Sequence, residues 1–104
     1  MFNLGLVFIF AKIHETVEAT ILACCDSELV GKTLKHGKIN FRVSEQFYKG
    51  EQVAEQKLAE LLGEFENINL VGKKVVSVAM KAGLVDEKSV IKIGAVPHVQ
   101  IFKV

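Results

Sequence analysis

The segment Asp26–Thr33 (DSELVGKT) ends in Gly-Lys-Thr directly after a predicted strand, as a nucleotide-binding phosphate loop does. Such a loop needs glycine at its first position, where backbone N–H groups wrap the phosphate, and a helix after its last residue. Here the first position is Asp26, whose carboxylate repels phosphate, and Gly37 with an alternating strand follows instead of a helix. We therefore expect no nucleotide hydrolysis here, and we interpret the segment as a turn in which Asp26 or Ser27 caps a short helical stretch.

Five side chains could bind a metal ion or act as nucleophile and base, namely Cys24, Cys25, His14, His36 and His98. No CxxC, HxxxH or HExxH spacing puts two of them on one face, so we predict no metal site, with assembly of distant ligands as the open alternative. The cysteines are adjacent, and neighbours in a strand point to opposite faces, so we expect two buried hydrophobes rather than a disulfide. Covalent catalysis by Cys25 with His14 or His98 has no support in spacing, so we predict no catalytic residue and no cofactor.

The charges are segregated along the chain although the net charge is only +1. The segment 31–42 carries four cations and no acid, the segment 44–66 has four net negative charges, and the segment 73–92 has three net positive charges. Two lysines near a predicted helix start are locally unfavourable, because the N-terminal end of a helix prefers anions, and an external phosphate would reverse that penalty. Residues predicted to contact phosphates or bases are Lys32, Lys35, Lys38, Arg42, Lys73, Lys74 and His98.

These basic segments, with Phe41, Phe47 and Tyr48 nearby in sequence, suit RNA bound by backbone contacts and stacking. The alternative from the residues alone is an ordinary solvated face whose lysines pair with the acidic segment. If the two basic segments converge, their lysines and arginine share one face of the molecule.

Period-two patterns predict the strands that position these side chains. Val7–His14 and Thr20–Cys25 are expected to form a hairpin, and Lys32–Lys35 and Ile39–Val43 another, with the bend at His36 and Gly37 and with Arg42 facing water. Two closing strands are expected at Val90–Ile93 and Val99–Val104, joined across Gly94–Pro97.

Helical spacing of apolar residues predicts two helices between these strands. One spans Glu51–Phe65 with glutamates on its polar side, and the other spans Leu70–Ala82, with Asn69 as N-cap and Gly83 just after its end. The order of strands and helices is segregated, which favours one α+β domain over residues 1–104, with a largely antiparallel sheet and both helices on one face.

The composition agrees with a folded domain of 104 residues, since 50% of the residues are hydrophobic and 24% charged. No apolar run reaches the roughly 20 residues of a membrane helix. The apolar segment Met1–Ala11 lacks a basic start and a cleavage site, so we interpret it as part of a first strand rather than a signal peptide. The cysteine usage suits a reducing cytoplasm.

Four segments together resemble one known family: Cys25–Leu34, Val43–Glu51, Asn69–Asp86 and Ile91–Val104. The chain resembles, over about residues 8–104, the small archaeal proteins of the domain of unknown function 424 family, which are described as RNA-binding. The leader Met1–Val7 and the extra Cys24 depart from the family pattern. The resemblance implies a cytoplasmic archaeal protein with a link to translation, and it implies no active-site residue.

We therefore expect a non-enzymatic protein that binds RNA and is associated with translation. The alternative is a protein-interaction adaptor or homodimeric scaffold that uses the acidic helix and an apolar surface, which the mean hydropathy of +0.32 allows. No membrane partner is expected.

Overall fold

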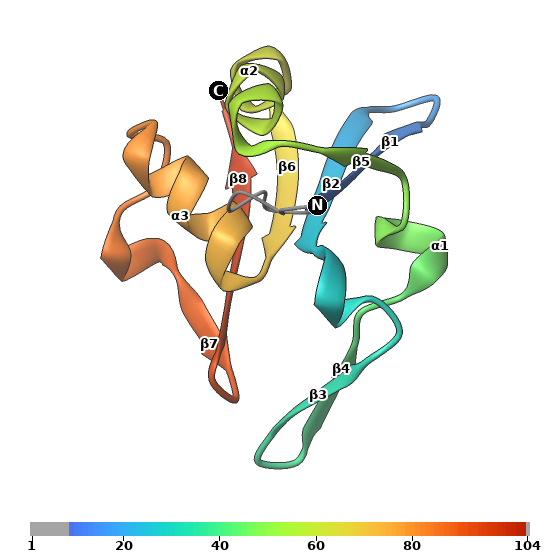
Figure 1. The fold of residues 1–104 in the computed structure, drawn as a ribbon, viewed down its shortest axis with the longest axis vertical. Helices are drawn as coiled ribbons and strands as arrows, with labels where there is room; N and C mark the ends of the chain where they lie inside the picture. The colour runs from blue at the N-terminus through green and yellow to red at the C-terminus, as the bar shows by residue number, and fades with distance from the viewer. Residues whose placement is uncertain (1–8, 104) are drawn as a thin grey trace, which may run out of the picture.

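The computed structural model describes residues 9–103 as one six-stranded sheet with an attached two-stranded hairpin (Figure 1). The strand order in the main sheet is β5-β1-β2-β6-β8-β7, and β3 and β4 form the hairpin. The strands are β1 Ile9–Glu15, β2 Thr20–Asp26, β3 Thr33–His36, β4 Ile39–Arg42, β5 Glu51–Val53, β6 Asn67–Val71, β7 Ile91–Ile93 and β8 Val96–Phe102. The helices are α1 Glu45–Tyr48, α2 Glu55–Glu64 and α3 Lys73–Lys81, and 3₁₀ turns lie at Ser27–Leu29 and Glu87–Ser89.

The sheet is largely antiparallel, as expected. β2 and β6 are its one parallel pair among the described residues, and the other neighbours run antiparallel. The three predicted hairpins all form, as β1–β2, β3–β4 and β7–β8. The α+β fold predicted from the sequence is therefore confirmed.

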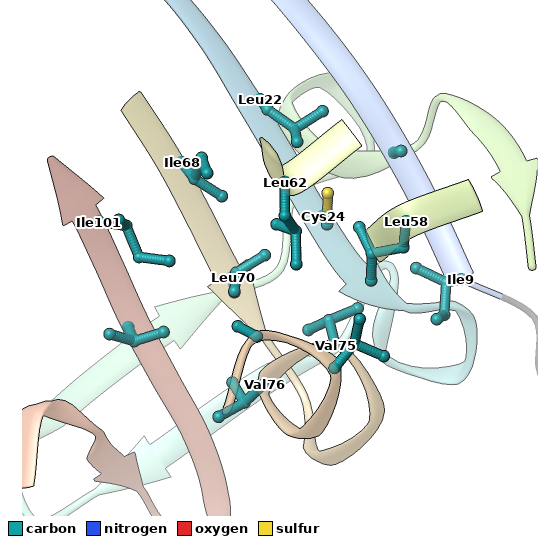
Figure 2. Packing of buried hydrophobic residues seen from close by; sticks show 14 of the residues in the cluster. Ile9, Leu22, Cys24, Leu58, Leu62, Ile68, Leu70, Val75, Val76 and Ile101 are labelled. Atoms are coloured by element: carbon teal, nitrogen blue, oxygen red, sulfur yellow. The ribbon is translucent and has the colours of Figure 1, made fainter. Parts of the chain in front are cut away.

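Helices α2 and α3 cover one face of the sheet, as predicted. Figure 2 shows Leu58 and Leu62 of α2 directed toward Cys24 of β2, with Val75 and Val76 of α3 beside them. These apolar side chains are almost wholly buried because each amphipathic helix turns its stripe of aliphatic residues toward the strands.

The opposite face of the sheet is covered in part by α1, the first 3₁₀ turn and the β3–β4 hairpin. Tyr48 of α1, Leu29 of the turn and Val43 after the hairpin pack there against Cys25 and Val71. Because this layer and the helical layer enclose β2 from both sides, its residues 22–26 are all buried. A strand buried on both faces appears in sequence as a continuous apolar run, and residues 21–25 of β2 form such a run.

The start of the second predicted helix is wrong. Leu70 and Val71 belong to β6, which lies between β2 and β8, and α3 begins at Lys73 after Gly72 rather than after an Asn69 cap. The short apolar run of β6 merges in sequence with that of the helix, and periodicity alone does not separate two such runs. The predicted end is confirmed, since Gly83 follows the helix with a φ of 76°.

The start of the first predicted helix is also wrong. Residues 51–53 form β5 at the sheet edge, and α2 begins only at Glu55. A separate helix, α1, precedes them, and the Ser44 side chain caps it by accepting a hydrogen bond from the Phe47 N–H. Gly50 lies between α1 and β5, and only glycine fits there, because a Cβ would lie 2.3 Å from the Ala11 carbonyl oxygen of β1.

Predictions at the two chain ends extend past the described residues. Val7 and Phe8 of the first predicted strand lie outside them, as does Val104 of the last. The last strand begins at Val96, three residues earlier than predicted. Among residues 9–103, no helix is both long and apolar enough to cross a membrane.

Candidate nucleic-acid interface

The β3–β4 hairpin extends from one end of the molecule and carries the first predicted basic segment (Figure 1). Its register pairs Thr33 with Arg42 and Lys35 with Asn40. Residues directly opposite each other in an antiparallel pair point to the same side, and alternate residues share a side. One face of the hairpin, which we call the outer face, therefore presents Thr33, Lys35, Asn40 and Arg42, all exposed.

The inner face of the hairpin attaches it to the sheet. Leu34 and Phe41 are opposite each other and pack into the second core cluster. The Phe41 ring lies 5.3 Å, centroid to centroid, from the His98 ring on β8. At the other end, the His36 Nδ1 accepts a hydrogen bond of 3.1 Å from the Gly94 N–H. These contacts hold the outer face in a defined orientation relative to the sheet.

The turn of the hairpin adds a third cation, Lys38, to the two on its outer face. Lys32 stands at the hairpin base, where its carbonyl accepts a hydrogen bond of 2.8 Å from the Val43 N–H. All four cations are exposed. Within residues 9–103 the ion pairs are Lys49–Glu45 and Lys74–Glu28, so the hairpin cations have no acidic partner there. The interpretation that acidic residues neutralise them therefore has no support.

The start of α3 is capped by the carboxylate of Asp26. No local sequence pattern indicates this contact. The two carboxylate oxygens of Asp26 accept hydrogen bonds of 3.0 Å each from the backbone N–H groups of Lys74 and Val75. Asp26 does not cap the 3₁₀ turn that directly follows it. It caps a helix that begins 47 residues later in the chain instead, so these two N–H groups are already bonded and are not open to an external phosphate.

Lys73 and Lys74 stand apart from the hairpin cations. They open a helix on the helical face of the sheet, whereas the hairpin packs against the opposite face. The Lys74 ammonium lies 3.6 Å from the Glu28 carboxylate, and Lys73 borders a groove beside α3. The structure thus brings four of the six predicted cations together on one hairpin.

His98 lies within β8, between β6 and β7, and is 9% exposed, although the last strand is predicted to begin only at Val99. Its Nδ1 donates a hydrogen bond of 2.9 Å to the Leu70 carbonyl. Burial lowers its pKa, although this hydrogen bond opposes the effect. His98 therefore acts in packing, where it supports Phe41.

The two cysteines point to opposite faces of β2 and both are free, as expected. Burial raises the pKa of the Cys24 thiol far above its usual value and that of Cys25 to about 12. Among the histidines considered as partners of Cys25, His14 bonds through Nε2 to the Phe47 carbonyl and stacks on the Phe47 ring. In residues 9–103, no three metal-ligating side chains gather at one point.

We expect both thiols to be inert in the folded protein. Thiolates are the reactive form, so buried thiols with raised pKa values should react with a disulfide reagent at pH 8 at least about 100-fold more slowly than in denaturant. Spectrophotometric thiol titration in buffer and in guanidinium measures this ratio. Rapid modification of one thiol in the native protein would contradict the burial described above.

Comparisons with known proteins bear on this fold. The model of a family described as "Protein of unknown function (DUF424)" matches residues 14–104. A similar solved structure is the crystal structure of an uncharacterized conserved protein from Methanopyrus kandleri, with 34% sequence identity and a TM-score of 0.76. The match covers 93% of this chain and 94% of that one. No curated protein matches the chain.

Proposed function

The chain belongs to the DUF424 family, and we propose that it binds RNA through the outer face, the turn and the base of the β3–β4 hairpin. The observation that carries this proposal is the set of four exposed cations on one short ribbon, with no acidic partner among the described residues. Cations that lack acidic partners gain most from phosphate, because each phosphate they neutralise releases condensed counterions.

The shape and the other side chains of the hairpin fit the same ligand. A two-stranded ribbon is narrow enough to enter a groove of a nucleic acid or to lie along a single strand. Asn40 lies opposite Lys35 and two residues before Arg42 on the outer face, and its amide can both donate to and accept from a base edge. Phosphate contacts by the cations would set the position of the strand, and Asn40 would contact a base.

We propose no catalytic role for this surface, because phosphate binding by lysine and arginine needs no reaction. The acidic helix α2 supports the alternative of a protein adaptor less well. Its residues Leu58 and Leu62 are fully buried and Leu61 is half-buried, so few of its apolar side chains are available to a partner. An association with translation and a cytoplasmic location stay predictions, and the two free buried cysteines fit a reducing compartment.

The test replaces Lys35 and Lys38 by alanine and titrates a labelled single-stranded RNA pool at two salt concentrations. We expect affinity to fall at least about tenfold, since each lost charge-assisted contact contributes about 1.5 kcal/mol or more. The slope of log affinity against log salt should drop by about 1.4, because each single-strand phosphate contact contributes about 0.7. The melting temperature should stay nearly unchanged, because both side chains are exposed.

The matched control replaces Lys49 and Lys57, two exposed lysines in the acidic part of the chain, and removes the same net charge. This control should keep both the affinity and the slope. DNA of the same sequence, tested in parallel, separates RNA recognition from general phosphate binding. Equal losses in the two double variants, or none in either, would rule out the hairpin as the binding surface.

A further inference from the structure

A groove of about 490 Å³ lies between α3 and the edge of the sheet at β7 and β8, apart from the outer face of the hairpin. Its apolar part is formed by Val76 and Met80 of α3, by Val90 and by Pro97 of β8. Met80 is 39% exposed, so a large apolar side chain forms part of the open surface of the groove. The groove falls within the range of about 300–1,000 Å³ in which proteins enclose most of a ligand's surface.

Three lysines surround this apolar part: Lys73 and Lys81 at the two ends of α3, and Lys92 on β7. One acid, Glu87, lines the same groove. None of the three lysines is in an ion pair with a residue of the described range. An occupant that buries apolar surface here would thus also meet two net positive charges, which carboxylates on the occupant would balance.

The residues that line the groove favour a peptide over a nucleic acid. No aromatic side chain of the described residues borders the groove, so a nucleobase would find nothing to stack on. A flexible methionine with aliphatic neighbours adapts instead to aliphatic or aromatic side chains of a peptide, as methionine-rich recognition grooves do.

Segments of this chain itself do not match the groove. Residues 1–8 are apolar but contain no acid, so they would leave the three lysines unpaired. Helix α2 of a second copy has acids on its exposed side, but Leu58 and Leu62 are buried and Leu61 is half-buried against its own core, so the helix offers no fully exposed leucine as an anchor. The groove therefore matches a segment that carries both acidic side chains and an apolar anchor.

We propose that this groove binds a short acidic segment of a partner protein. One large apolar side chain of the partner inserts between Met80 and Pro97, and its carboxylates pair with Lys73, Lys81 and Lys92. This is a second binding surface, and it does not depend on the RNA proposal.

The test uses a fluorescein-labelled synthetic dodecapeptide of glutamate and aspartate with two leucines four residues apart, followed by fluorescence anisotropy. A second probe has serine in place of both leucines and the same charge. We expect the leucine probe to bind with a micromolar dissociation constant and the serine probe at least about tenfold more weakly, because burial of a leucine side chain favours binding. Binding should weaken as salt rises.

Two variants test the location. Met80→Glu places a carboxylate among the apolar residues and should reduce binding of the leucine probe at least about tenfold. If its melting curve shows unfolding, Met80→Ser replaces it, with a smaller loss expected. Lys81→Ala with Lys92→Ala should weaken binding similarly, whereas Lys57→Ala, on the exposed side of α2, should not.

Several outcomes would overturn the proposal: no binding below millimolar concentration, equal binding of both probes, or full affinity in the Met80 variant. Displacement of the leucine probe by single-stranded RNA would assign the groove to nucleic acid instead. The Lys35→Ala, Lys38→Ala variant should bind the leucine probe normally, so failure of the RNA proposal and failure of this one are distinguishable.

Discussion

Replacement of Gly72 by alanine is expected to destabilise the protein by about 4 kcal/mol or more, because it combines backbone strain with a steric clash. Gly72 has φ 124° and ψ 151°, a backbone conformation that is essentially restricted to glycine. A Cβ at this position would also lie 2.3 Å from the carboxylate carbon of Asp26. The chain passes from β6 into α3 at this residue, so neither neighbour can shift without disturbing the core.

Thermal unfolding followed by circular dichroism measures this loss, with a fall in melting temperature of roughly 15–30 °C expected for a domain of this size. Gly83→Ala is the matched control, because Gly83 also has a positive φ but a Cβ there would meet no atom within 4 Å. It should cost only about 1–2 kcal/mol.

The double variant with Asp26→Ala separates the two causes in Gly72→Ala. Removing the carboxylate relieves the clash but leaves the backbone strain, so the double variant should lose at least about 1 kcal/mol less than the sum of the single losses. Strict additivity would show that the close approach of Asp26 contributes nothing.

Asp26→Ala on its own is expected to destabilise the protein by about 2 kcal/mol. The change leaves the N–H groups of Lys74 and Val75 without their acceptor, and a buried unpaired donor costs about 1–3 kcal/mol. Burial raises the pKa of Asp26 in spite of the two hydrogen bonds, so relief of that desolvation offsets part of the loss. Denaturant unfolding at pH 7 measures the difference. Ser27→Ala, at the adjacent half-buried position, is the control and should change stability little.

The pH dependence gives an independent check, with Asp26→Asn as the isosteric reference. Because the pKa of Asp26 is higher in the folded protein than the usual value of 3.8, the folded state binds its proton more tightly than the unfolded chain does. The stability of the wild type relative to Asp26→Asn should therefore fall as pH rises from about 3.8 through the raised pKa, and level off above it. A relative stability that rises over this window would show that the hydrogen bonds outweigh burial.

The hairpins and the charge map could be predicted from the sequence, because both depend on neighbours a few residues apart. Alternation within two residues is enough to show that Ile39–Arg42 forms a strand whose Arg42 faces water. The same rule directs Cys24 and Cys25 to opposite faces of β2. Ile39, by contrast, is 61% exposed, since the pattern indicates a strand without showing how far the core extends beneath it.

Features that join distant segments depend on the tertiary structure. Leu70 and Val71 end a strand rather than begin a helix because β6 fits between β2 and β8 in the sheet. The order of strands in the sheet cannot be predicted from any local pattern. The same placement directs the Asp26 carboxylate to the start of α3, far along the chain, and buries His98 against Phe41.

In the candidate site, too, some features could be predicted from the sequence and others depend on the tertiary structure. The four cations of residues 31–42, with no acid among them, are evident in the sequence, since charge and spacing are properties of the chain. Folding alone pairs Lys74 with Glu28, fills the start of α3 with Asp26, and leaves the hairpin cations without an acidic partner in the described range. The physical reason is that electrostatic partners are set by distances of a few ångströms in space, whatever their separation along the chain.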